Sequence, residues 1–298
     1  MWIKAPGQIS DNVYQITSAT SSHFVIVDEG AGIVDTGVSA LKDTLIADLK
    51  NLIGDPENLV YIFLTHTHFD HVGGIPYLRQ FAPDVQVVGL PQTAELFSKK
   101  EVLDAAYEHN KACAEAMNVE LGMSKEEWCK ALRVDRIAGD GDTVVLGDDV
   151  HVKVIATPGH VEEGTSYYVL PDAALAGAEV FGGYGGRDKA HPSFTSSYKS
   201  YISTIDKLLG LEVKVLGLPH GGSLTGDLTK KFMLDARASA ERFHTTVKLR
   251  LEQGELVPEI AASILPEWES ETVCPEGPFV TLRKECVEQM VKVVAEGR

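Results

Sequence analysis

Three histidines and an aspartate fall within the six residues 66–71, which read His-Thr-His-Phe-Asp-His. They directly follow residues 59–65, a nearly continuous apolar run that is typical of a buried strand. Side chains two residues apart project to the same side of an extended chain, so His66 and His68 can converge on one point. Asp70 and His71 come where the chain turns into the next helix, so they can address a second point. Such polar groups are costly to bury unless they bind something, and zinc or iron suits these nitrogen and oxygen ligands.

Three further short motifs occur along the chain, one before the histidine cluster and two after it. Residues 34–37 read Val-Asp-Thr-Gly, residues 157–160 read Thr-Pro-Gly-His, with Gly-Thr-Ser at 164–166, and residues 218–222 read Leu-Pro-His-Gly-Gly. Together with the histidine cluster, these motifs resemble those of the metallo-β-lactamase superfamily. The resemblance implies an α/β fold, the αββα sandwich, with metals at one edge of its two sheets.

The same resemblance implies a site for two divalent metal ions, zinc or iron, with manganese as an alternative. His66, His68 and His160 resemble the ligands of the first ion. The implied ligands of the second ion are Asp70, His71 and His220. In the family, water between the metals attacks a carbonyl or phosphoryl centre, and Asp70 is the candidate catalytic residue because a carboxylate can orient that water or accept its proton. Asp35 is expected to support the histidine loop through hydrogen bonds.

One position departs from the family pattern. An aspartate usually bridges both metals, but here the aligned stretch 175–181 reads Leu-Ala-Gly-Ala-Glu-Val-Phe and places Ala178 at that position. Glu179 is next in the sequence, and a one-residue β-bulge would let it take over the bridging role. Strand alternation would otherwise point Glu179 away from the metals.

This departure leaves three hypotheses open. The favoured one is an active hydrolase in which Glu179 is a metal ligand. The second is a protein with one firmly bound metal and altered chemistry, such as an iron-dependent oxygenase of the persulfide dioxygenase kind. The third is a metal-binding regulatory protein with little catalysis.

The branch of the superfamily is indicated by several smaller features. No cysteine occupies the bridging position, which disfavours the cysteine-ligand β-lactamases, and helices after the core resemble the glyoxalase II branch. The opening residues 5–9, which read Ala-Pro-Gly-Gln-Ile, a helical insertion at 92–134 and a helical C-terminus resemble PqsE-type thioesterases with a helical cap, and this likeness covers nearly the whole chain. These resemblances imply a small ester or thioester as substrate. The aromatic residues that could form an apolar wall beside the site are Phe181, Tyr184, Phe194 and Tyr107. The basic residues that could attract an anionic tail of the substrate are Arg187, Lys189 and His191.

The chain organisation predicts a core with two helical additions. Residues 1–225 alternate strands and helices and form the expected metallo-β-lactamase core. Residues 92–134 are rich in Ala, Glu, Lys and Leu and read as a helical insertion, with a capping-box pattern at 124–127. Residues 226–298 read as a C-terminal helical cap, whose last helix begins near Pro278.

Composition limits the partners. The net charge of −16 disfavours a nucleic-acid backbone, which needs clustered Lys and Arg. No apolar run reaches the roughly 20 residues that cross a bilayer, and no secretory signal is apparent, so we expect a cytoplasmic protein with no membrane partner. The four cysteines show no paired spacing, so we expect free thiols. A small-molecule substrate is expected, and a homodimer stays an open alternative. The remaining histidines, for which we expect ordinary roles, are His23, His109, His151, His191 and His244.

Overall fold

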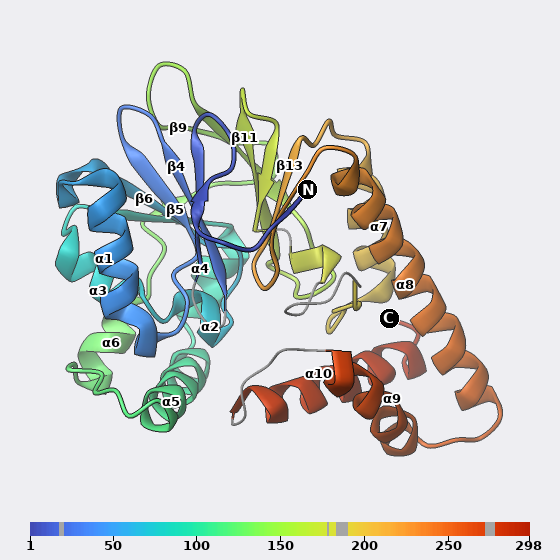
Figure 1. Ribbon diagram of the computed structural model, residues 1–298. Helices are drawn as coiled ribbons and strands as arrows, with labels where there is room; N and C mark the ends of the chain where they lie inside the picture. Colours follow the sequence, from blue (N-terminus) through green and yellow to red (C-terminus); the bar gives the residue numbers. More distant parts are fainter. Residues whose placement is uncertain (18–20, 178, 183–189, 272–277) are drawn as a thin grey trace.

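The computed structural model describes residues 1–17, 21–177, 179–182, 190–271 and 278–298. Within these residues, the strands form two sheets of seven strands each, with helices on the outer face of both sheets (Figure 1). Each sheet thus buries one face against the other sheet and one face against helices. The αββα sandwich expected from the motifs is confirmed.

The first sheet has the order β2-β3-β4-β5-β6-β7-β8 and carries the histidine cluster. Its strands are β2 (Gly7–Gln8), β3 (Val13–Thr17), β4 (Ser22–Val27), β5 (Ala31–Val34), β6 (Leu59–Phe63), β7 (Gln86–Gly89) and β8 (Arg136–Ile137). Strand β6 runs parallel to both β5 and β7. The carboxyl ends of β5 and β6 therefore meet at one edge, and the loops that follow them hold residues 35–37 and 66–71.

The second sheet has the order β1-β14-β13-β12-β11-β10-β9. Its strands are β1 (Trp2–Ile3), β9 (Thr143–Val145), β10 (His151–Ala156), β11 (Thr165–Leu170), β12 (Ala174–Ala176), β13 (Val215–Leu218) and β14 (Gly222–Thr225). Strand β11 is antiparallel to β10 and β12, and β12 is parallel to β13. The carboxyl ends of β10, β12 and β13 therefore share one edge, which brings His160, Glu179 and His220 to it.

Aliphatic and aromatic side chains fill the space between the sheets. Phe24, Phe63 and Val88 of the first sheet share a buried cluster with Val154 and Tyr167 of the second. The rings of Phe63 and Tyr167 lie 5.0 Å apart, and the Tyr167 hydroxyl donates to the carbonyl oxygen of Leu64 at 2.7 Å. This contact fixes the end of β6, from which the histidine cluster starts, against the opposite sheet.

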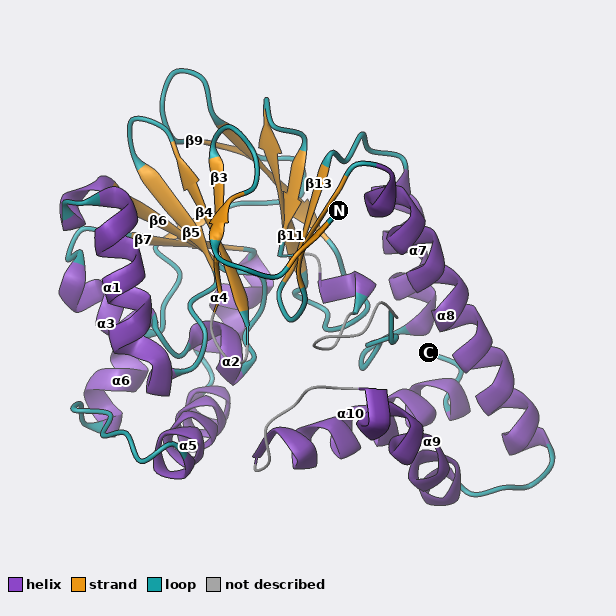
Figure 2. Ribbon diagram, in the orientation of Figure 1, coloured by secondary structure: helices purple, strands orange, loops and turns teal. Residues whose placement is uncertain are grey.

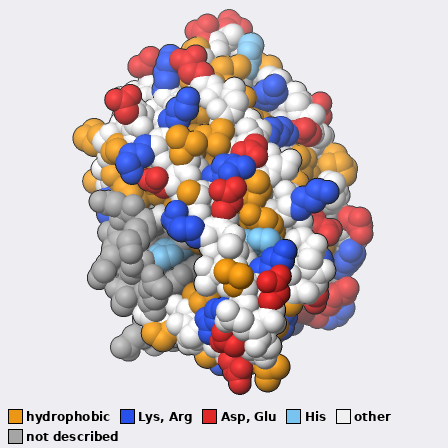
Figure 3. Space-filling view, turned by 90° about the vertical axis from the view of Figure 1, so that its right-hand side faces the viewer, with side chains coloured by type: hydrophobic (Ala, Val, Ile, Leu, Met, Phe, Trp, Pro, Cys, Tyr) orange, Lys and Arg blue, Asp and Glu red, His pale blue; other side chains and the backbone are white. Residues whose placement is uncertain are grey.

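Amphipathic helices cover the outer faces (Figure 2). On the first sheet these are α1 (Lys42–Ile53) and α3 (Ile75–Phe81), and on the second α7 (Tyr198–Leu209) and α8 (Asp227–Glu252). The face that carries α7 and α8 shows Lys and Arg interspersed with Asp and Glu (Figure 3). There Arg237 pairs with Asp206 and Glu241. The acidic surplus is therefore not gathered into one patch on this face.

The segment 92–134 is helical, as its composition predicted. It contains α5 (Lys100–Ala116) and α6 (Lys125–Ala131) and most of α4 (Pro91–Phe97). The expected capping box opens α6: the Ser124 hydroxyl accepts from the Glu127 N–H, and the Glu127 carboxylate accepts from the Ser124 N–H. Helix α5 packs on α2 (Phe69–Val72), which carries Asp70 and His71.

The C-terminal region adds α9 (Val257–Glu271) and α10 (Pro278–Ala295) beyond α8. Helix α10 contacts α8, α9 and also α5, so the two helical additions meet. The boundary expected near residue 226 stays a prediction as a domain division, although α8 does begin at Asp227. Among the described residues, no helix has both the length and the apolar character that a membrane crossing requires.

Several expected details were wrong or incomplete. The Val, Ile, Tyr and Thr content of residues 13–27 predicts one arm of a β-hairpin, but this stretch contains two antiparallel strands, β3 and β4. The sequence indicates no strand at the positions of β1, β2, β8, β12 and β14, because two to four residues are too few to show a periodicity. Glu179, for which the sequence suggested a strand with a β-bulge, is buried and begins the 3-10 turn η3 (Glu179–Phe181). The other 3-10 turns are η1 (Ser39–Leu41) and η2 (Pro56–Asn58).

Candidate metal centre

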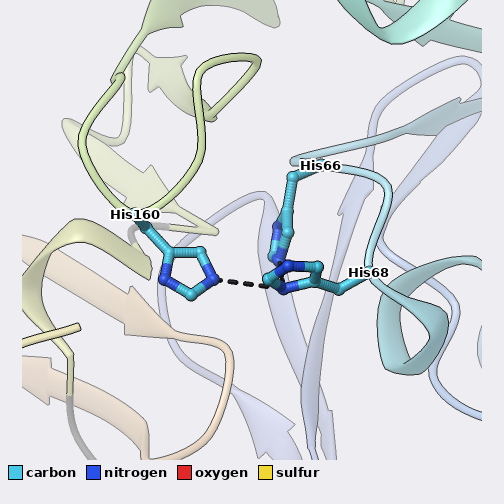
Figure 4. A group of neighbouring side chains, drawn as sticks. All are labelled: His66, His68 and His160. Carbon is cyan, nitrogen blue, oxygen red and sulfur yellow. Dashed lines mark hydrogen bonds between the residues drawn. The ribbon is translucent and has the colours of Figure 1, made fainter. Parts of the chain in front are cut away.

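The first ligand group consists of His66, His68 and His160, whose rings point toward one another (Figure 4). His66 Nε2 lies 2.9 Å and His160 Nε2 lies 3.2 Å from His68 Nδ1. His66 and His68 come from the loop after β6, and His160 comes from the loop after β10 on the other sheet. Three ring nitrogens from two sheets therefore converge, as a metal ion with imidazole ligands requires.

The opposite ring nitrogen of each buried imidazole is anchored. His66 Nδ1 lies 2.9 Å from the Thr65 hydroxyl, and His160 Nδ1 donates to the Ser193 carbonyl oxygen at 2.7 Å. His71 Nδ1 donates to the Asp35 carboxylate at 2.8 Å. These bonds fix the tautomer and leave Nε2 of each ring directed at the centre, which is the arrangement found around metal-ligating histidines.

The second ligand group consists of Asp70, His71 and His220. Asp70 Oδ2 lies 3.5 Å from His220 Nε2 and 3.8 Å from His71 Nε2. Ligands that each sit about 2.0–2.2 Å from one ion are separated by roughly 3–4 Å, so this spacing fits a shared cation. Helix α2 supplies Asp70 and His71, and the loop after β13 supplies His220.

Glu179 lies beside the second group. Its Oε2 is 3.7 Å from His220 Nε2, and only 8% of the residue is exposed. The β-bulge that we expected is not how it gets there. Strand β12 ends at Ala176, Gly177 takes a φ of 73°, and the Glu179 N–H bonds to the Gly177 carbonyl oxygen. A glycine adopts this left-handed conformation without strain, so the chain turns off the strand and strand alternation no longer applies.

The two groups differ in their electrostatics. Burial lowers the pKa of His66 and His160 well below the ordinary value, and neighbouring imidazoles lower it further. Burial also acts to lower the pKa of His71, but the carboxylates of Asp35 and Asp70 outweigh it and raise that pKa to about 9. Burial raises the pKa of Glu179. The first group is thus neutral, whereas the second combines carboxylates with a readily protonated imidazole.

Asp35 supports both groups. Its backbone φ is 57°, and its carboxylate accepts from the Thr65 N–H at 2.9 Å and from the Thr65 hydroxyl at 2.7 Å. The same carboxylate accepts from His71 Nδ1. The expected role of Asp35 in supporting the histidine loop is confirmed by these bonds.

The segment 193–197 supports His160, and sequence reasoning missed it. Besides the bond from His160 Nδ1 to the Ser193 carbonyl oxygen, the Thr195 N–H donates to the His160 carbonyl oxygen at 3.2 Å. Gln289 of α10 donates to the Thr195 carbonyl oxygen at 3.2 Å. Serines and threonines carry no motif of their own, so no signal in the sequence distinguished these from other loop residues.

Access to the centre is uneven. His68 is exposed, Asp70 and His220 are half-buried, and His66, His71 and His160 are buried. Phe181 and Phe194, proposed for an apolar wall, are fully buried residues of one hydrophobic core cluster.

Tyr107, also proposed for the wall, packs edge-on against Trp128. The other proposed wall and anion-binding residues, Tyr184, Arg187 and Lys189, lie outside the described residues. His191, which is buried, belongs to neither ligand group, and the same holds for His23, whose burial lowers its pKa to about 4.

Comparison with known proteins adds a family match. The family model of the metallo-β-lactamase superfamily matches residues 17–220, a stretch that begins before the Val-Asp-Thr-Gly motif at 34–37 and ends at His220.

Individual relatives are more distant. The nitric oxide reductase of Moorella thermoacetica is 39% identical over 69 residues, which are 23% of this chain and 17% of that protein. The cytoplasmic hydroxyacylglutathione hydrolase of Arabidopsis thaliana is 25% identical over 150 residues, 49% of this chain and 42% of that protein. The chain therefore spans less than half the length of either relative.

A solved structure matches over nearly the whole chain. It is that of an archaeal metallo-β-lactamase superfamily protein from Sulfolobus tokodaii, with a TM-score of 0.61 and 20% identity. The match covers 96% of this chain and 98% of the archaeal one, helical additions included. At this identity the likeness shows the shared fold alone.

Proposed function

We propose that this chain, which belongs to the metallo-β-lactamase superfamily, is a metal-dependent hydrolase with two divalent ions, zinc or iron, at the described centre. The observation that carries the proposal is the convergence of the ring nitrogens of His66, His68 and His160, each buried ring being anchored through its other nitrogen. Manganese is an alternative metal for the second group, because that group contains carboxylate.

The chemistry follows from these donors. Bound ions of this kind lower the pKa of a coordinated water toward neutrality and stabilise negative charge that develops on a carbonyl oxygen. Asp70 is half-buried, and its carboxylate would orient the attacking water and accept its proton. Burial acts to raise the pKa of Asp70, but His71 and His220 outweigh it and lower the pKa, which keeps the carboxylate ionised.

We assign Glu179 to the second ion. The support is the position of its buried carboxylate, 3.7 Å from His220 Nε2. A buried carboxylate is costly unless a cation compensates it, and two ions close together repel unless anionic groups lie between or beside them. Glu179 would thus replace the aspartate that Ala178 does not supply.

The proposed substrate is a small ester or thioester. Its support is the similarity to the Arabidopsis protein, whose name denotes hydrolysis of an acylglutathione. The exposure of His68 lets a small molecule approach the first group from solvent. The likeness to PqsE-type thioesterases, the anionic character of the substrate, the cytoplasmic location and the homodimer stay predictions.

The test combines metal analysis with an activity panel. The full chain, purified without added metal and then reconstituted, should contain at least one zinc, iron or manganese per chain and should hydrolyse members of a panel of thioesters, lactones and phosphodiesters. Absence of metal after reconstitution would refute the proposal. Firm binding of iron with oxygen consumption would favour the oxygenase hypothesis, and metal binding without turnover would favour the regulatory one.

A further inference from the structure

A buried carboxylate joins the two loops that build the first ligand group. Glu163, three residues after His160, is 5% exposed. Its Oε1 accepts from the Thr67 hydroxyl at 2.7 Å and from the Thr67 N–H at 3.3 Å. Thr67 is the residue between His66 and His68, so this side chain ties the loop of one sheet to the loop of the other where the three imidazoles meet.

Backbone hydrogen bonds hold the bases of both loops, but not this point. The Thr157 N–H donates to the Gly164 carbonyl oxygen at 2.7 Å and closes the loop that carries His160. The Thr165 N–H donates to the Thr65 carbonyl oxygen at 2.9 Å and links the two sheets. The Glu163 side chain adds hydrogen bonds farther along the histidine loop, to Thr67, the residue that separates His66 from His68.

The charge of Glu163 is the second observation. Within the described part of the chain, no lysine or arginine forms an ion pair with this buried carboxylate. A buried carboxylate is costly without a compensating charge. The first group itself contains three imidazoles and no carboxylate, so a divalent ion bound there would bring two positive charges that its own ligands do not neutralise.

We propose that Glu163 is a positioning residue of the first metal site: it fixes Thr67, and through it His66 and His68, against the His160 loop, and it supplies negative charge that the three imidazoles lack. The inference rests on the proposed function, because it takes the first group to be a metal site. It extends that function to a residue outside every ligand motif in the sequence.

A set of variants separates the hydrogen bonds from the charge. Glu163→Gln keeps an oxygen that accepts both bonds from Thr67 but removes the charge, whereas Glu163→Ala removes both. Thr67→Val removes the hydroxyl donor and keeps the N–H. Glu162→Gln is the matched control, because it makes the same charge change one residue away at an exposed position.

Zinc affinity is measured on the full chain by competition with a chromophoric chelator. A His220→Ala background weakens metal binding in the second group and leaves the first group complete. We expect Glu163→Ala to weaken zinc binding by about 10- to 100-fold, the usual effect of removing a residue that orients metal ligands. Glu163→Gln should weaken zinc binding less than Glu163→Ala does, and Thr67→Val should weaken it less again. Glu162→Gln should leave zinc affinity unchanged.

Hydrogen exchange of the Thr67 amide in the metal-free protein gives a readout independent of metal. Exchange should be faster in Glu163→Ala and close to that of the parent in Glu163→Gln. Zinc affinity equal to that of the parent in both Glu163 variants would overturn this inference but not the proposed function. A loss of zinc affinity in Glu162→Gln equal to that in the Glu163 variants would do the same. Absence of zinc binding by the unmodified protein would instead overturn the proposed function and the inference with it.

Discussion

The first and second ligand groups lie at the same sheet edge but are built from different chemistry. His66, His68 and His160 are three imidazoles with lone pairs directed at one point. Asp70, His71 and His220 include a carboxylate, and Glu179 adds another beside them. No member of the first group carries a charge that would compensate a bound ion, whereas carboxylates within and beside the second group would largely neutralise an ion there. The two positions therefore differ in the carboxylates that would compensate a bound ion.

The largest effect should come from removing one ligand of each group. His68→Ala should abolish metal binding in the first group, and His220→Ala should weaken it in the second. Each should lower hydrolysis by at least about 100-fold, because a bound ion contributes several kcal/mol to the reaction. Metal analysis and steady-state kinetics measure both effects. His151→Ala is the control, since His151 is exposed and lies in neither group; metal content equal to that control would contradict the assignment.

Asp35 supports both ligand groups, because its carboxylate accepts hydrogen bonds from Thr65 and from His71. Asp35→Ala leaves the buried His71 without its partner, and breaking a buried pair costs about 3–5 kcal/mol. Urea unfolding of the metal-free protein should show this loss in the free energy of unfolding. The exposed Asp84→Ala is the control, and a difference below about 1 kcal/mol between the two variants would show that the pair is not needed.

Glu179→Gln removes one negative charge beside the second group and so tests whether that carboxylate compensates the second ion. We expect weaker binding of the second ion by about 10- to 100-fold, with the first ion retained at His66, His68 and His160. Calorimetry or anomalous scattering counts the ions in each case. Glu212→Gln, at an exposed position, controls for net charge. Unchanged stoichiometry together with unchanged hydrolysis would make Glu179 a bystander.

The smallest expected difference is in proton release. The pKa of His71 is about 9 without metal, so near pH 7.5 this imidazole is protonated and must lose a proton before Nε2 can bind an ion. Affinity in the second group should therefore fall by about tenfold for each pH unit below 9. The buried imidazoles His66 and His160, whose pKa burial lowers, are already neutral and should release none.

Calorimetry in two buffers of different protonation enthalpy measures this release. The His68→Ala variant reports the second group, and the His220→Ala variant reports the first. About one proton should be released in the former case and close to none in the latter. Equal release in both variants would contradict the electrostatic difference between the groups.

Much of the centre follows from the sequence because its ligands are local. His66, His68, Asp70 and His71 lie within six residues, in the loop after β6 and in helix α2, and the strand before them predicts which of them converge. His160 and His220 each lie in a short motif of their own. The fold class followed from the same motifs, since their order along the chain is that of one family. The helical segments within 92–134 and 226–298 were also predicted, the first from its composition and the second from apolar spacing over several turns.

Tertiary structure decided what depends on distant residues or on a single backbone angle. Strand alternation turns Glu179 away from the centre, and only the left-handed Gly177 and the 3-10 turn after it place the carboxylate beside His220. Ser193 contacts His160, which lies 33 residues away in the sequence, and Glu163 contacts Thr67, which lies 96 residues away. A hydroxyl or carboxylate gains such a role from the element it packs against, which periodicity and motif spacing do not encode. The sequence thus predicted the two candidate ligand groups. The packing of the two sheets placed Ser193 and Glu163 against them and brought the carboxylate of Glu179 beside His220.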